Sequence, residues 1–283
     1  MLINSMSTTP TPTSDTSNTS IKGELYMWIG FGMTAGDVNA QRIANARDTY
    51  GIPIWLDTGN WGYAQLTSDY INYFHAHGVK VICRIWSNYG DNPLDNILHR
   101  MDPGSGSRFD RGSVDYQLSI GPEIDGFMID ECDQNDYNYY RAIADYVHSK
   151  GKLLFVNPGT HIIQERTFDY ADKISVELSW WALTQTRPDL VARHPNEFIG
   201  QTNDYGYNGY SSTDVKYMPP KTASGDRPAY VYPLSLERAI WDTKTGWNSG
   251  IILESRPGDT NGNIESASKL PDWWEQYIAE ILT

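Results

Sequence analysis

Four carboxylates follow one another in the segment IDGFMIDECDQND, residues 124 to 136. Asp130 and Glu131 end an apolar run, whereas Asp133 and Asp136 come directly before the helical pattern YNYYRAIADYV. Acidic side chains at the start of a helix cap its free N–H groups and favour its dipole, and we assign this role to Asp133 and Asp136. Asp130 and Glu131 terminate the apolar run itself and need another explanation.

A third acid, Glu177, lies inside the apolar run ISVELSWW, where an unpaired charge is costly unless it faces an open site. Two carboxylates suit the cleavage of a glycosidic bond: one, protonated, assists the leaving oxygen, while the other, ionised, attacks or activates water. Because like charges a few ångströms apart raise one pKa, we predict Asp130, Glu131 and Glu177 as catalytic carboxylates that share one proton near neutral pH. The alternative is a buried ion-pair network with Arg84 or Arg141.

The elements that carry these acids follow a regular order. Short β-rich runs alternate with helical patterns from Lys22 onward, as is typical of βα units around a parallel sheet. The eight runs are 24–32, 52–58, 79–86, 124–130, 152–158, 173–179, 197–203 and 250–255. Helical patterns cover 36–50, 64–77, 136–150, 235–245 and 269–282. We therefore predict an α/β fold, a single (β/α)8 TIM barrel over residues 22–283, after a disordered Ser/Thr/Pro-rich tail over residues 1–21.

Three of the helical patterns stop at a glycine, Gly51, Gly78 or Gly151, which is the usual left-handed residue just past a helix. An open doubly wound sheet is less favoured, since no G-x-G-x-x-G follows the first run, and nucleotide cofactors are not expected. Residues 204–233, rich in Tyr, Gly, Ser and Pro, are too long for an ordinary connection and are predicted to form an elaborated loop near the site.

In a TIM barrel the chemistry lies at the C-terminal ends of the strands. Alternation puts Asp130 on the same strand face as Met128, and Glu131 on the face of Ile129, so we expect Asp130 to point inward. Its carboxyl group is expected about 5 to 9 Å from that of Glu177, a range that covers both retaining and inverting hydrolysis. Substrate-binding residues are predicted at other strand ends, with aromatic rings stacking on sugars or serving only for packing: Asp57, Trp61, Trp86, Tyr89, Asn157, Trp180, Trp181 and Glu254.

Composition narrows the classes of partner. The 22 basic against 35 acidic residues, a net charge of -13, argue against nucleic acid and fit solubility or a cationic substrate. No stretch approaches the roughly 20 apolar residues of a membrane span. Cys83 and Cys132 are predicted to be free thiols, and the scattered histidines indicate no metal site. The tail suggests an extracellular or cell-surface protein whose targeting segment is not visible in this chain.

Five segments together resemble one known family. They are GVKVICRIWSNYG (78–90), IDGFMIDE (124–131), YYRAIADYVHSKG (139–151), FVNPGT (155–160) and ADKISVE (171–177). In order and spacing they are similar to the motifs of the spherulin-four-like proteins, which include glycoside hydrolase family 135 and are more distantly similar to family 114. The resemblance covers residues 78–181 at motif level.

This resemblance implies a TIM barrel and endo-acting hydrolysis of α-1,4-linked galactosamine or N-acetylgalactosamine polymers. It also implies that Asp130, Glu131 and Glu177 are the functional carboxylates. Two alternatives from other classes stay open: a non-catalytic carbohydrate-binding barrel protein, and a metal-dependent hydrolase that uses the acidic cluster to hold Mg²⁺ or Ca²⁺.

Overall fold

The strands form a closed ring. The computed structural model describes residues 23–28, 36–58, 67–102, 112–159, 163–176, 187–203, 250–254 and 273–283, with the single positions 236, 240, 243, 244 and 270. All neighbouring strands pair in parallel, and β1 pairs with β8 to close the barrel. The strands are β1 Glu24–Trp28, β2 Ile54–Thr58, β3 Lys80–Trp86, β4 Gly126–Asp130, β5 Leu153–Asn157, β6 Lys173–Val176, β7 Phe198–Asn203 and β8 Gly250–Glu254. The predicted (β/α)8 barrel is confirmed.

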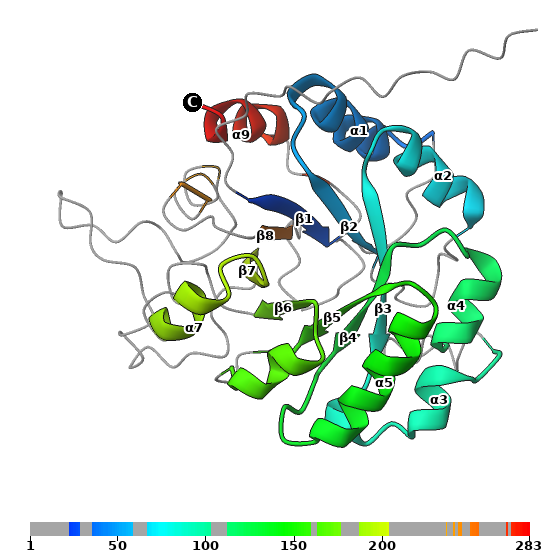
Figure 1. Cartoon of the computed structure of the whole chain (residues 1–283). Coiled ribbons are helices and arrows are strands. Elements are labelled where there is room, and N and C mark those ends of the chain that lie inside the picture. The colour runs from blue at the N-terminus through cyan, green and yellow to red at the C-terminus, as the bar shows by residue number, and fades with distance from the viewer. Residues whose placement is uncertain are drawn as a thin grey trace, which may run out of the picture.

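Helices surround this ring (Figure 1), and the C-terminal helix lies beside the first one. Arg42 and Glu275 form an ion pair that ties these two helices together. The described helices are α1 Val38–Tyr50, α2 Ser68–Ala76, α3 Leu94–Leu98, α4 Val114–Ile120, α5 Tyr137–Ser149, α7 Pro188–Arg193 and α9 Trp274–Ile281, with short 3₁₀ turns η1 Asn88–Gly90 and η2 Glu165–Asp169. None of them is long and apolar enough to cross a membrane.

The predicted helix ends are also confirmed, since Gly51, Gly78 and Gly151 all have φ near 70°. Asp136 is the N-cap of α5 and accepts the N–H of Tyr139 at 3.3 Å, as predicted. The sequence did not indicate α3, α4 or α7, which have seven residues or fewer. The tail over 1–21 and the loop over 204–233 lie outside the described residues, as does most of 235–245.

The barrel has two apolar cores, separated by the strands. Side chains at one parity of each strand pack against the helices, and the others fill the barrel interior. The interior layer consists of Tyr26, Trp55, Ile82, Met128, Phe155 and Ile199, all buried. Tyr26 stacks on Trp55, and the edge of Phe155 meets both rings. This layer, called the aromatic floor below, fills the barrel interior, so the side chains two residues further along β2, β3, β4 and β5 face the C-terminal mouth.

The opposite end of the barrel is fastened by two equivalent histidine–aspartate contacts. His75, in the last turn of α2, bonds through Nε2 to Asp125 Oδ2 at 2.9 Å, and the same oxygen accepts the Val81 N–H. His148, in the last turn of α5, bonds to Asp172 Oδ2 at 2.8 Å, and this oxygen accepts the Leu154 N–H. We call these two arrangements the base clamps.

Candidate active site

A polar layer lies directly above the aromatic floor. Asp57, Arg84, Asp130 and Asn157 stand two residues beyond Trp55, Ile82, Met128 and Phe155 on four adjacent strands. Because side chains alternate along a strand, these four residues share the interior face. The prediction that Asp130 points inward with Met128 is confirmed by its contacts with Arg84 and Asn157.

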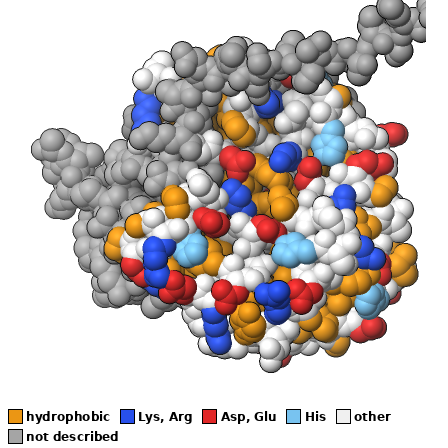
Figure 2. Space-filling model, in the orientation of Figure 1, with side chains coloured by type: hydrophobic (Ala, Val, Ile, Leu, Met, Phe, Trp, Pro, Cys, Tyr) orange, Lys and Arg blue, Asp and Glu red, His pale blue; other side chains and the backbone are white. Residues whose placement is uncertain are grey.

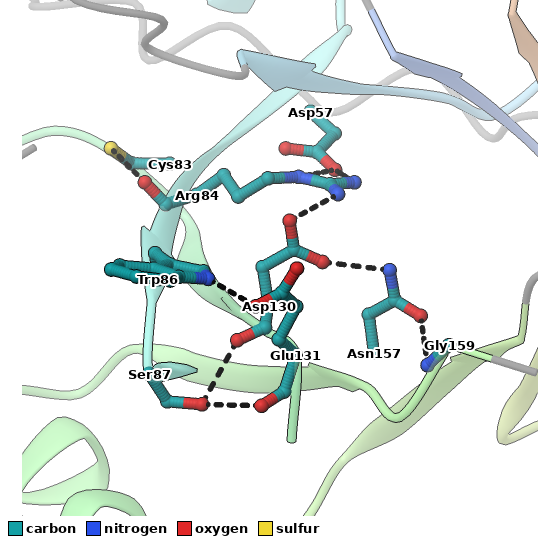
Figure 3. Close-up of polar contacts among 9 residues, drawn as sticks. All are labelled: Asp57, Cys83, Arg84, Trp86, Ser87, Asp130, Glu131, Asn157 and Gly159. Atoms are coloured by element: carbon teal, nitrogen blue, oxygen red, sulfur yellow. Dashed lines mark hydrogen bonds and ion pairs between the residues drawn. The ribbon is translucent and has the colours of Figure 1, made fainter. Parts of the chain in front are cut away.

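Arg84 bridges two acids in this layer (Figure 3). Its Nε donates to Asp57 Oδ2 at 3.0 Å, its Nη2 donates to the same oxygen, and its Nη1 lies 3.1 Å from Asp130 Oδ2. The Arg84 and Asp57 side chains are 2% and 0% exposed, whereas that of Asp130 is 18% exposed. Burial alone would lower the pKa of Arg84, but the carboxylates of Asp130 and Asp57 outweigh burial and raise it above its ordinary value.

The charged neighbour of Asp130 is therefore a guanidinium. The sequence left open a buried ion-pair network with Arg84 or Arg141, and the structure contains this network with Arg84. Arg141 pairs instead with the exposed Asp145 at 2.9 Å. Within the described residues, the positive charge of Arg84 therefore offsets the repulsion that was expected between Asp130 and other carboxylates.

Asn157 holds the other oxygen of Asp130. Its Nδ2 donates to Asp130 Oδ1 at 2.7 Å, and its own Oδ1 accepts the Gly159 N–H at 2.9 Å. The second bond determines which end of the amide faces Asp130, because only the oxygen can accept from a backbone N–H. Donors from β3 and β5 thus fix the carboxylate of Asp130 from both sides.

Glu131 departs from strand geometry. The strand ends at Asp130, and Glu131 has φ 54°, in the left-handed region that residues with a side chain rarely adopt. Its carboxylate accepts a hydrogen bond from Trp86 Nε1. The expectation that Glu131 shares the outer face of Ile129 is therefore wrong, because the change in φ redirects its side chain towards Trp86 (Figure 3).

Residues with a strained backbone conformation cluster at the C-terminal mouth of the barrel. Among the described residues, the non-glycine positions with positive φ are Asn88, Tyr89 and Glu131, and the Tyr89 N–H donates to the Glu131 carbonyl at 2.8 Å. Each such position costs of order 1 to 3 kcal/mol, and such costs cluster at functional sites. The two loops that follow β3 and β4 are therefore strained where they meet.

A buried hydroxyl chain holds these loops together. Ser87 Oγ lies 2.9 and 2.8 Å from the carbonyl oxygens of Asp130 and Glu131, so its single hydroxyl proton is shared between these two acceptors. Tyr140 then donates to Ser87 Oγ over 2.9 Å, and accepts the Asp133 N–H over 2.9 Å. This chain orients the backbone on both sides of the acidic pair.

Comparisons with known proteins identify the fold. No family model matches the chain, and no curated protein matches it. Among solved structures, a GH20 exo-β-N-acetylglucosaminidase from Vibrio harveyi is similar, with a TM-score of 0.52 and 12% identity over 93% of this chain and 54% of that one. The spore cortex-lytic enzyme SleL of Bacillus megaterium has a TM-score of 0.51 and 10% identity, over 97% of this chain and 76% of that one. At such identities the likeness shows the barrel fold, and this chain spans about half of the Vibrio enzyme.

The other predicted site residues separate into three groups. Asp57 and Asn157, predicted to bind substrate, are fully buried and bond to Arg84 and Asp130. Trp86 is half-buried against Glu131, and the Tyr89 side chain is exposed at the mouth. The structure describes only the backbone of Glu254, at the end of β8. The other predicted positions lie outside the described residues: Trp61, Glu177, Trp180 and Trp181.

Sequence reasoning did not find Ser87 and Tyr140, which carry no signal of their own. Arg84 was named only as a rival partner, although a signal existed: it is the one charged residue inside the apolar run VICRIW.

On the surface, acidic and basic side chains intermingle over the face drawn in Figure 2. Within the described part of the chain, no group of three or more His, Cys, Asp or Glu side chains is arranged to hold a metal ion.

Proposed function

We propose that this protein is a glycoside hydrolase that cleaves an amino-sugar polysaccharide. The observation that carries the proposal is the adjacent pair at the barrel mouth, Asp130 and Glu131. Asp130 is paired with a guanidinium, whereas Glu131 accepts a bond from a neutral indole and has no lysine or arginine partner among the described residues. Two neighbouring carboxyl groups in unlike environments are what the division into an ionised group and a proton donor requires.

Asp130 is the nucleophile or the electrostatic partner in this mechanism. As the glycosidic C–O bond breaks, positive charge develops on the anomeric carbon, and the Asp130 carboxylate either attacks this carbon or stabilises its charge. A carboxylic acid, Glu177 with Glu131 tuning or sharing its role, gives its proton to the leaving oxygen. The same group then takes a proton from the water that completes hydrolysis.

We propose a polymer of α-1,4-linked galactosamine or N-acetylgalactosamine as the substrate, cleaved within the chain and outside the cell. The resemblance to the spherulin-four-like proteins supports this linkage. The net charge of -13 suits a partly deacetylated, cationic polymer. The name of the Vibrio enzyme also refers to an N-acetylated amino sugar, which is consistent with this class of substrate.

Purified protein incubated with galactosamine-containing polysaccharide, chitosan and a neutral glucan tests the proposal, with the products sized by mass spectrometry. We expect short oligosaccharides from the first polymer. Asp130→Asn and Glu177→Gln should each reduce the rate at least about 100-fold. Asp145→Asn is the matched control, because Asp145 is 62% exposed in a surface ion pair. Full activity in both Asp130→Asn and Glu177→Gln would show that these carboxylates do not catalyse cleavage.

A second measurement separates Glu131 from Glu177. A substrate with a strongly acidic leaving group, such as a dinitrophenyl glycoside, needs little help from a proton donor. The variant that lacks the general acid therefore keeps most of its rate on this substrate but loses its rate on the polymer. The variant that lacks a residue with another role loses similar factors on both.

The same assays decide between the proposal and its rivals. Polymer that is bound but not cleaved would favour a non-catalytic carbohydrate-binding barrel protein. Cleavage that EDTA abolishes and Mg²⁺ or Ca²⁺ restores would favour a metal-dependent hydrolase.

A further inference from the structure

Arg84 has a geometry that a simple structural ion pair does not need. A buried ion pair is weak support for stability, since apolar replacements of similar volume are often neutral or stabilising. Here the guanidinium uses one edge, Nε and Nη2, on a single oxygen of Asp57. Its third nitrogen, Nη1, is thereby presented to Asp130 Oδ2 at 3.1 Å.

The buried position of Asp57 suits a residue that orients another side chain. Its side chain is 0% exposed and lies on the far side of Arg84 from Asp130, so it fixes the rotation of the guanidinium (Figure 3). Arg84 is 2% exposed and meets Asp130, whose side chain is the most exposed of the three at 18%. Exposure increases in order from Asp57 through Arg84 to Asp130, and only Asp130 reaches the mouth.

We propose that Arg84 is a positioning residue for Asp130, oriented in turn by Asp57. This inference rests on the proposed function, and it adds a requirement: the Asp130 carboxylate must be held in one orientation by the planar fork of Arg84. Arg84 does not touch the substrate. Its contribution is therefore to the rate of the chemical step, through Asp130, and not to the binding of the polymer.

The difficulty in testing Arg84 is that Arg84→Met leaves the carboxylate of Asp57 buried without its cation, and this destabilises the fold. The double variant Asp57→Asn/Arg84→Met removes both charges and keeps similar volumes. Its melting temperature separates the structural role from the positioning role. Arg141→Met, which removes an exposed arginine, is the matched control.

We expect Arg84→Met to melt at least about 5 °C below the parent and to lose at least about 100-fold in kcat. The double variant should recover most of the melting temperature, but its kcat should stay about 100-fold low with KM within about threefold of the parent. Arg84→Lys keeps the charge but not the fork, and its kcat should fall at least about tenfold. Arg141→Met should resemble the parent in both measurements.

A double variant that is as stable as the parent and keeps kcat within about threefold would overturn the inference while the glycosidase proposal stands. Full kcat in Arg84→Lys would overturn the requirement for the fork. If the parent cleaves none of the polymers, the proposed function itself fails and the inference falls with it. These results are distinguishable because the parent is assayed in every experiment.

Discussion

At the scale of single residues, the candidate site depends on which atom of each side chain faces Asp130. Arg84 presents a nitrogen that the Asp57 contact has fixed, and Asn157 presents a nitrogen because its oxygen is occupied by the Gly159 N–H. Both oxygens of Asp130 thus receive donors from rigid strands. A site on strands is held more closely than one on loops, which suits a group that must meet a developing charge.

The amide of Asn157 gives a test of this arrangement. Asn157→Asp replaces the donor to Asp130 with a second carboxylate oxygen, while the bond from Gly159 is kept. We expect at least about a 100-fold loss of activity and a loss of about 1 to 3 kcal/mol in the free energy of unfolding. The rate of polymer cleavage and urea unfolding measure the two effects. Asn138→Asp, an exposed position on α5, should change neither by much.

At the scale of elements, the strain at the ends of β3 and β4 predicts an effect on stability that is separate from activity. Glu131→Ala and Glu131→Gly both remove the carboxylate, but only glycine adopts φ 54° without cost. We expect Glu131→Gly to be about 1 kcal/mol more stable than Glu131→Ala, with equal activities. Chemical unfolding of the two variants measures this difference. Equal stabilities would mean that the turn relaxes when the side chain is lost.

Close approach of two strands predicts a second effect on an element. A Cβ atom at Gly126, the first residue of β4, would lie 2.6 Å from the Leu153 carbonyl oxygen. Gly126→Ala must therefore push β5 away and should cost about 2 kcal/mol or more in the free energy of unfolding. Gly36→Ala is the control, since a Cβ there meets nothing within 4 Å, and it should change stability by less than about 0.5 kcal/mol. Equal costs would contradict the steric explanation.

At the scale of the whole molecule, two buried tyrosines, Tyr140 and Tyr170, and two half-buried ones, Tyr70 and Tyr139, predict how the fold responds to alkali. Burial, the largest cause, raises the pKa of Tyr70, Tyr139, Tyr140 and Tyr170 above the ordinary value. The folded state therefore holds these protons more tightly than the unfolded state, whose tyrosines titrate near 10. The resulting stability is fully present below about pH 10 and is lost as the pH rises further.

We expect tyrosinate absorbance at 295 nm to rise for these groups together with the loss of helical circular dichroism in an alkaline titration. Tyr70→Phe removes one such group and should reduce the amplitude of that step. Absorbance that rises to completion while circular dichroism is unchanged would contradict burial of the hydroxyl groups.

The sequence predicted the barrel because its signals are local and repeat. The strands show apolar runs, and three helices end at Gly51, Gly78 and Gly151, whose left-handed conformation follows from the lack of a side chain. Asp130 was placed correctly because alternation depends only on a regular strand. The prediction for Glu131 was wrong because β4 ends one residue earlier, at Asp130, and no local sequence pattern predicts a strained φ angle.

The side-chain contacts between neighbouring strands could not be predicted from the sequence, for a different reason. The alternation that placed Asp130 also puts Arg84 on the inner face, yet the choice between Arg84 and Arg141 as partner remained open. Which strand ends meet at equal height depends on the stagger of the barrel, which the sequence of one chain does not state. The buried chain from Tyr140 to Ser87 depends on the same stagger and on how α5 packs.

The base clamps have a consequence for the evolution and redesign of this barrel. In both, a histidine stands three residues before a glycine and six before the bonded strand residue, and its aspartate directly precedes the next strand. Each clamp therefore closes one pair of neighbouring strands, β3 with β4 and β5 with β6, within its own segment of chain. A strand pair that carries its own fastening is a natural unit for duplication, and for grafting into another barrel with its mouth left free to change.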